Sequence, residues 1–197
     1  LKFISYENKK SNFVPFEKFV NSLINECNNL TSVWESRTTK KGFQSKGNLF
    51  KLKTPSIVNL KKIILEAINE YKIKYKTKSD GFISQWPNQF SLLGWYNKLL
   101  KHGYQQSHIH PGGWLSGCFY LKMPKQLKKS EGAINFGLHG YDYPMMNSNI
   151  PSYQFIPVEG DLVLFPSSLF HKTLPFSSND ERHVIAFDII PERMNNV

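Results

Sequence analysis

Cysteine is almost absent from this chain, which has only Cys27 and Cys118 among its 197 residues. A disulfide framework is therefore not expected. Cys27 falls on the apolar face of a predicted helix, and Cys118 falls inside a strand-like run, so we expect two buried free thiols. Thiols kept in this form are typical of a reducing compartment, and we predict a cytoplasmic protein.

Long apolar runs are also lacking. No stretch of about 18 apolar residues occurs, so we expect no transmembrane helix. The first residues have no apolar core of the kind found in secretory signals. The chain begins with Leu1 rather than Met, as expected of a fragment or a processed chain. Internal repeats and low-complexity linkers are absent, and the length predicts one domain, residues 1–197.

Acidic residues are few relative to basic ones. The chain has 25 Lys and Arg but only 15 Asp and Glu, a net charge of +10. This balance favours anionic partners without naming them. The simplest interpretation is a solvated basic surface, and an acidic substrate or a nucleic acid are the alternatives. The absence of a recognisable nucleic-acid-binding motif counts against the last of these.

Two segments of the first 80 residues have the apolar spacing of helices, and we predict helices over residues 15–28 and 56–73. Residues 37–48, which lie between them, are polar, Lys-rich and punctuated by glycine, a pattern typical of a loop.

Beyond residue 80 the pattern changes to short β-branched or aromatic runs. We predict strands over residues 82–84, 90–100, 114–122, 133–136, 153–157, 162–165 and 184–189. A helical part (1–80) followed by a strand-rich part (81–197) predicts a mainly β barrel or sandwich with helices packed on one side. Residues 141–150 are predicted to form a long loop that acts as a lid or a substrate wall.

Three histidines form the candidate metal site. On an extended strand His108 and His110 point to the same face, so both can reach one ion. His171 follows a predicted buried strand and is the third candidate. Three ligands on one side leave the other side of the ion open, as in non-haem iron oxygen chemistry. A histidine outside such a pattern is usually an ordinary core or surface residue, and we interpret His102 and His139 in that way.

Arg182 precedes the last predicted strand and is the candidate anion-binding residue. If it faced the interior of a barrel it would need an anion, because an unpaired buried guanidinium is costly. A carboxylate is its best partner because the two can pair through two hydrogen bonds. The alternative is an ordinary surface arginine beside Asp180 and Glu181.

These residues lie in motifs that resemble a known family, the iron(II)/2-oxoglutarate-dependent oxygenases of bacteria and viruses. Some members of that family carry the domain behind tetratricopeptide repeats. The resemblance covers about residues 84 to 190 and includes Asn97. It rests on four features in chain order: His108-x-His110, Ser116-Gly117-x-x-Tyr120-Leu121, the run from Gly160-Asp161-Leu162 through Phe165-Pro166-Ser167-Ser168-Leu169-x-His171, and Arg182.

The resemblance implies a double-stranded β-helix fold, with Fe(II) as the metal and 2-oxoglutarate and O2 as co-substrates. It implies a hydroxylase that releases succinate and CO2. It assigns metal binding to His108, His110 and His171 and the far carboxylate of 2-oxoglutarate to Arg182, and it places three further residues in the co-substrate site, Tyr120, Ser116 and Asn97.

One position departs from the common His-x-Asp motif of this superfamily, because His110 stands where the carboxylate is expected. An imidazole also fills the space that halogenating relatives leave for chloride, which argues against halogenation. Two arrangements stay open. Either His110 is a ligand, or it lies behind the ligands while water or a carboxylate completes the site; the candidate carboxylates are Asp142, Asp161 and Asp188.

Two other functions stay open. A cupin-like three-histidine dioxygenase that does not use 2-oxoglutarate explains the histidines equally well but assigns no task to Arg182. A non-enzymatic basic binding module would not depend on the histidines at all. The prime substrate is left unidentified by the sequence, and the net positive charge favours an anionic one.

Overall fold

The computed structural model describes residues 1–78, 80–125, 127–141, 143–144 and 149–192. Its strands form one antiparallel sheet in the order β1-β8-β5-β10-β4-β9-β6-β7, with the β2–β3 hairpin attached to β4. The strands are β1 Ser5–Asn8, β2 Ser32–Trp34, β3 Thr39–Ser45, β4 Phe90–His108, β5 Leu115–Lys122, β6 Ile134–Gly137, β7 Ser152–Phe155, β8 Asp161–Pro166, β9 Phe170–Thr173 and β10 Arg182–Pro191.

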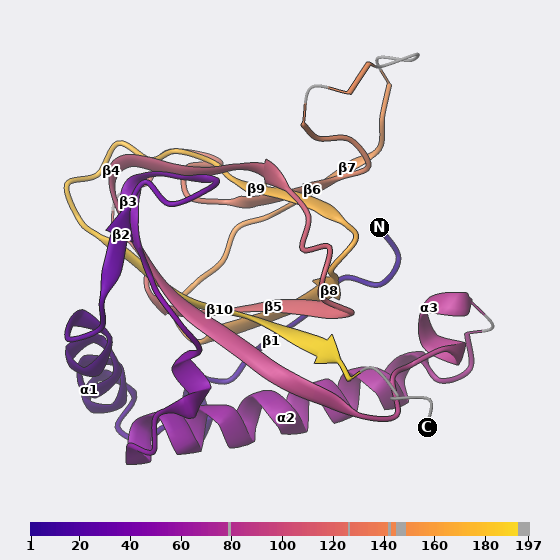
Figure 1. Cartoon of the computed structure of the whole chain (residues 1–197). Coiled ribbons are helices and arrows are strands. Elements are labelled where there is room, and N and C mark those ends of the chain that lie inside the picture. Colours follow the sequence, from indigo (N-terminus) through magenta and orange to yellow (C-terminus); the bar gives the residue numbers. More distant parts are fainter. Residues whose placement is uncertain (79, 126, 142, 145–148, 193–197) are drawn as a thin grey trace.

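The sheet curls so that its two halves face each other. In Figure 1, β6, β7 and β9 lie across the interior from β1, β5, β8 and β10. The long strand β4 belongs to both halves, because residues 90–99 pair with β10 whereas Gln105 and His108 pair with β9. This architecture is the double-stranded β-helix that the family resemblance implied, and it agrees with the barrel or sandwich predicted from the strand pattern.

Helices cover the outer face of one half. These are α1 Phe16–Asn28 and α2 Pro55–Tyr75, close to the predicted ranges, and Figure 1 shows α2 running across the outside of β10, β5 and β1. Side chains alternate along each strand, so Ile185 and Phe187 join the cluster that includes both helices, whereas Val184 joins the cluster inside the sheet. The prediction of helices packed on one side is confirmed.

The prediction for the segment before β4 was partly wrong. Residues 37–48 contain the strand β3, which pairs with β2 and β4, rather than only a loop. Its buried positions are Thr39, Gly42 and Ser45, none of which is large and apolar, so the usual alternation is hidden. Gly42 is required by packing, since a Cβ there would lie 2.5 Å from the Lys98 carbonyl oxygen.

Other predicted elements also differ from those in the structure. Residues 82–84 lie in the short helix α3, Gly81–Ser84, not in a strand. Two 3-10 turns, η1 Lys10–Asn12 and η2 Leu49–Lys51, and the strands β1 to β3 fall within the first 80 residues, which are therefore not purely helical. Strand β4 continues to His108, and β9 was not predicted. No helix in the part of the chain that the structure describes is long and apolar enough to span a membrane.

Cys27 is buried and Cys118 is partly buried, and both are free thiols as predicted. Burial raises the pKa of each thiol to about 12, so both stay protonated at neutral pH.

Because the core between sheet and helices holds the strands of the site in place, we expect Phe119→Ala to lower the free energy of unfolding by about 3–5 kcal/mol. Phe119 is fully buried and packs against Phe13 at 5.5 Å between ring centroids. Chemical denaturation measures the change. The control is Ile156→Ala, at a side chain that is 54% exposed, where a change within about 0.5 kcal/mol is expected. Equal effects of the two substitutions would contradict this account of the core.

Candidate metal centre

Three imidazoles that are far apart in the sequence meet inside the sheet. His108 ends β4 and lies directly opposite His171 on β9, and His110 follows two residues after the strand end. One ring nitrogen from each lies within 4.8 Å of the other two. The ring centroids are 4.3 Å apart for His108 and His171, 5.1 Å for His108 and His110, and 4.9 Å for His110 and His171. This grouping matches the trio predicted from the sequence.

Hydrogen bonds fix which nitrogen of two rings is free. The Nδ1 of His108 lies 2.7 Å from the Gln106 carbonyl oxygen, and the Nδ1 of His171 lies 3.0 Å from the Leu169 carbonyl oxygen. A carbonyl oxygen only accepts hydrogen bonds, so each Nδ1 must donate and carries the ring proton. The Nε2 lone pair of both rings is then available for a metal ion.

Burial keeps these two rings neutral. It lowers the pKa of His108 to about 4. Burial, together with the neighbouring His108 and His110, holds the pKa of His171 well below its usual value. A neutral imidazole is the form that binds a metal ion, so both side chains are in the ligating state at pH 7.

His110 has a different partner. Its Nδ1 lies 2.7 Å from Oδ1 of Asp188, and the Ser116 hydroxyl donates to the same oxygen at 2.6 Å. The Ser116 and Ser167 hydroxyls are 2.8 Å apart. Ser116 is thus tied to the metal centre, and its predicted contact with 2-oxoglutarate stays a prediction. Sequence patterns offered no reason to assign Ser167 to the site, because its side-chain partner Ser116 is 51 residues away along the chain.

Three of the predicted co-substrate residues carry buried polar atoms without a hydrogen-bond partner. Among the described residues the complete set of such atoms is Asn97 Oδ1, Tyr120 hydroxyl, Arg182 Nε and Trp114 Nε1. Buried polar groups are normally paired, and leaving one unpaired costs about 1–3 kcal/mol. Asn97, Tyr120 and Arg182 lie on the adjacent strands β4, β5 and β10 and fit a polar ligand that is bound between them.

Arg182 is 2% exposed, and its guanidinium lies over the Tyr120 ring, 5.1 Å from the centroid. No carboxylate among the described residues forms an ion pair with it. Burial lowers the pKa of Arg182, which reflects the cost of an uncompensated charge. The surface alternative considered for Arg182 is therefore wrong, and the site fits an anion. His183 faces the other way, as alternation predicted, and contacts Tyr96.

A cleft of about 660 Å³ leads to the histidines. Its exposed lining residues, which form the mouth, include Arg37 between β2 and β3, Lys46 directly after β3, and Tyr141. Its inner end reaches Cys118 and Ala186. On the same faces of β5 and β10, Tyr120 and Arg182 lie further in, beyond the lining of the cleft.

The remaining candidates from the sequence lie elsewhere. Asp161 accepts hydrogen bonds from Asn8 and from the Val158 backbone, so it has a structural role in a turn. Asp142 is outside the described residues, as are residues 145–148 of the predicted loop. His102 and His139 are not part of the histidine cluster, as expected.

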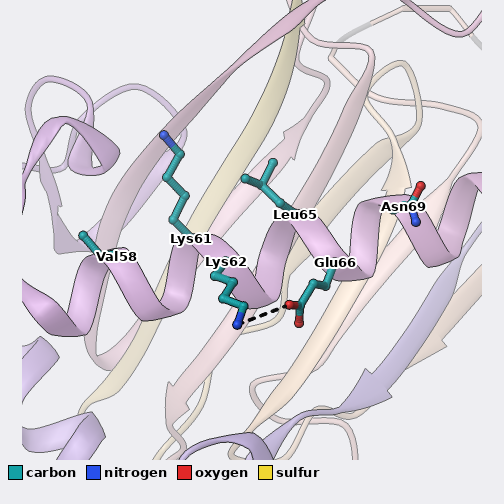
Figure 2. Close-up of a pocket in the computed structure, with 6 residues that line it drawn as sticks. All are labelled: Val58, Lys61, Lys62, Leu65, Glu66 and Asn69. Carbon is teal, nitrogen blue, oxygen red and sulfur yellow. Dashed lines mark ion pairs between the residues drawn. The ribbon is translucent and has the colours of Figure 1, made fainter.

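Another hollow lies on the outer face of α2 (Figure 2). It is shallow and lined by Val58, Leu65 and the Lys62–Glu66 ion pair, whose charged atoms are 3.9 Å apart. It holds no cluster of metal-ligating side chains, so the cleft at the histidines is the candidate active site.

Comparison with known proteins agrees with this site. Residues 94–188 match the model of the family described as "Putative 2OG-Fe(II) oxygenase". No curated protein matches the sequence.

Solved structures show the same fold. A prolyl-4-hydroxylase of Pseudomonas putida is 13% identical with a TM-score of 0.60, and the match covers 96% of this chain and 93% of that chain. A viral collagen prolyl hydroxylase of Paramecium Bursaria Chlorella virus-1, in complex with 2-oxoglutarate, is 14% identical with a TM-score of 0.61 and 97% coverage of both chains. HygX of Streptomyces hygroscopicus, with nickel and 2-oxoglutarate bound, is 13% identical with a TM-score of 0.58, covering 95% and 82%.

The residues present fit the cofactors of this family. Neutral imidazoles suit Fe(II), and a buried arginine without an anion suits a dicarboxylate. The matched segment contains the His108–His110 pair, His171 and Asp188 and ends before the last residues of β10. Residues 94–188, just under half of the chain, therefore match the 2OG-Fe(II) oxygenase family whose motifs the sequence displays, and the site fits the cofactors of that family, Fe(II) and 2-oxoglutarate.

Proposed function

We propose that this protein is an Fe(II)- and 2-oxoglutarate-dependent dioxygenase that hydroxylates a small or extended anionic substrate. The observation that carries the proposal is that three inward imidazoles, on β9 and at the end of β4, share the interior of the sheet with Arg182 on β10. Arg182 is a buried arginine that forms no ion pair with any described residue. When bound, iron and 2-oxoglutarate would supply an oxidation by O2, in which one oxygen atom enters succinate as 2-oxoglutarate loses CO2 and the other becomes the hydroxyl group of the substrate.

The side chains of the chain then have distinct tasks. His108, His110 and His171 hold the metal through their free ring nitrogens. Arg182 binds the far carboxylate of 2-oxoglutarate, and the Tyr120 hydroxyl and the Asn97 side chain provide further hydrogen bonds. The walls of the cleft orient the substrate and keep bulk water away from the reacting atoms.

Two rival functions make different demands on these residues. A three-histidine dioxygenase that does not use 2-oxoglutarate needs the histidines but leaves Arg182 without a partner, at a continuing energetic cost. A basic binding module needs neither the histidines nor Arg182. The buried guanidinium, which forms no ion pair with a described residue, therefore favours the proposed function over both.

We expect His108→Ala and His171→Ala each to abolish stoichiometric Fe(II) binding, because each removes one of only three ligands. Anaerobic titration with Fe(II) and 2-oxoglutarate should give the weak visible charge-transfer band of the chelate with the unmodified protein and no band with either variant. His102→Ala, at an exposed residue outside the cluster, is the matched control and should keep the band. Full Fe(II) occupancy in a folded His171→Ala variant would contradict this assignment.

We expect Arg182→Met to weaken 2-oxoglutarate binding by at least about 30-fold while leaving Fe(II) affinity nearly unchanged, because a buried charge partner is worth about 2–5 kcal/mol. Without 2-oxoglutarate the variant should be as stable as the parent or more stable, since the substitution removes an unpaired buried cation. Thermal unfolding with and without 2-oxoglutarate tests both statements. Unchanged stabilisation by 2-oxoglutarate would favour the first rival function.

Charge at the cleft mouth supports an anionic substrate. Arg37 and Lys46 are exposed there, and Asp188, which is engaged by His110, is the acidic residue among those that line the cleft. Opposite charge raises the local concentration of a substrate and orients its approach.

We expect the Arg37→Glu, Lys46→Glu double variant to raise KM for the prime substrate at least about tenfold, and to leave KM for 2-oxoglutarate within about twofold. Substrate-stimulated succinate production measures both, first across a panel of acidic peptides, nucleotides and neutral small molecules with the unmodified protein. The control is Lys61→Glu, Lys62→Glu on the outer face of α2 (Figure 2), which makes the same change in net charge away from the cleft. A stimulating substrate whose KM is equally insensitive to both double variants would exclude this recognition.

A further inference from the structure

Asp188 is a buried carboxylate that is hydrogen-bonded to a candidate metal ligand, His110. It is 5% exposed and accepts from His110 Nδ1 at 2.7 Å and from the Ser116 hydroxyl at 2.6 Å, both at Oδ1. No lysine or arginine among the described residues forms an ion pair with it. The His110 ring N–H and the Ser116 hydroxyl are thus the groups that stabilise this buried carboxylate through hydrogen bonds.

The surroundings hold the pair in one arrangement. Asp188 on β10 lies directly opposite Ser116 on β5, and the His110 amide donates to the Ser167 carbonyl oxygen at 2.9 Å. At Gly113 an added Cβ would lie 2.5 Å from Ser167 Oγ and 3.3 Å from Asp188 Cγ. Glycine at this position therefore leaves the space that the network occupies.

The three imidazoles differ in the group that accepts a hydrogen bond from Nδ1. His108 and His171 donate to neutral backbone carbonyls, whereas His110 faces a carboxylate. His110 is also the residue that stands where the superfamily motif has a carboxylate ligand. A carboxylate at position 110 would bring a negative charge to the metal directly. In this chain the negative charge is carried by Asp188, which is hydrogen-bonded to the far side of the His110 ring.

We propose that Asp188 is a positioning residue that acts through His110, holding the proton on Nδ1, presenting Nε2 to the metal, and restoring part of the negative charge that the His-x-His sequence removes. The proposal rests on the proposed function, because it requires that the three histidines bind a metal ion. A carboxylate behind a ligating imidazole orients the ring and raises its basicity, and loss of such a partner typically costs about 10–100-fold in metal affinity.

The test is Fe(II) affinity measured by anaerobic calorimetry on the whole chain, with Asp188→Asn as the variant. This substitution keeps the shape and the acceptor oxygen while removing the charge. We expect affinity to fall about 10–100-fold. The charge-transfer band with 2-oxoglutarate should move to shorter wavelength and the Fe(III)/Fe(II) potential should rise, since the metal loses negative charge nearby.

Two comparisons separate positioning from a general structural effect. Asp161→Asn replaces another buried aspartate, which is hydrogen-bonded away from the histidines, and should leave the affinity within about threefold and the band unmoved. In a His110→Asp background Asp188 has no imidazole to orient, so adding Asp188→Asn should cost several-fold less affinity than it does in the native background.

The outcomes are distinct. If the unmodified protein binds no Fe(II), the proposed function and this inference both fail. If it binds Fe(II), but Asp188→Asn binds equally well with an unshifted band, the proposed function stands and this inference is overturned. Equal losses in the native and His110→Asp backgrounds would also overturn it. Asp188→Ser is a second charge-removing variant, for use if Asp188→Asn does not fold.

Discussion

The antiparallel pairing of β4 with β9 is the constraint on which the site depends. It places His108 opposite His171, and the chain leaving β4 brings His110 to the same point two residues later. The other end of β4 pairs with β10, so one strand fixes the histidines and the strand of Arg182 relative to each other. Packing of α1 and α2 on the outer face holds that half of the sheet, and the inner face is left for polar residues.

Burial has different consequences for the imidazoles and for the guanidinium in the interior. The pKa values of His108 and His171 are lowered, so these two rings are neutral and can each offer a lone pair to a cation. The guanidinium of Arg182 stays charged and has no anion among the described residues, although its neighbour Tyr120 offers a ring face and a hydroxyl. One part of the interior therefore fits a metal ion, and the adjoining part fits an anion, which is the combination that 2-oxoglutarate chemistry requires.

Local sequence patterns predicted most of this fold, and they failed where packing overrides them. The helices and most strands show clear periodicity, and the same-face spacing of His108 and His110 identified the centre. Strand β3 was missed because its buried positions carry Thr39, Gly42 and Ser45. The contact of His110 with Asp188 joins residues 78 positions apart, so only the register of β10 against its neighbours could reveal which of the candidate aspartates lies there.

That register also explains why Asp188 and Arg182 do not neutralise each other. Both lie on the same face of β10, but six residues of extended strand separate their Cα atoms by about 20 Å. Between them the inner face carries Ala186 and, on β5, Cys118, which are small and leave the inner end of the cleft open. Each side chain then has a separate partner, which for Asp188 is the imidazole of His110 and for Arg182, under the proposed function, is the far carboxylate of 2-oxoglutarate. A direct ion pair between Asp188 and Arg182 would neutralise both charges. Asp188 would then be lost to His110, and Arg182 would be lost to 2-oxoglutarate. The separation of the two residues along β10 therefore keeps each of them available for its own partner.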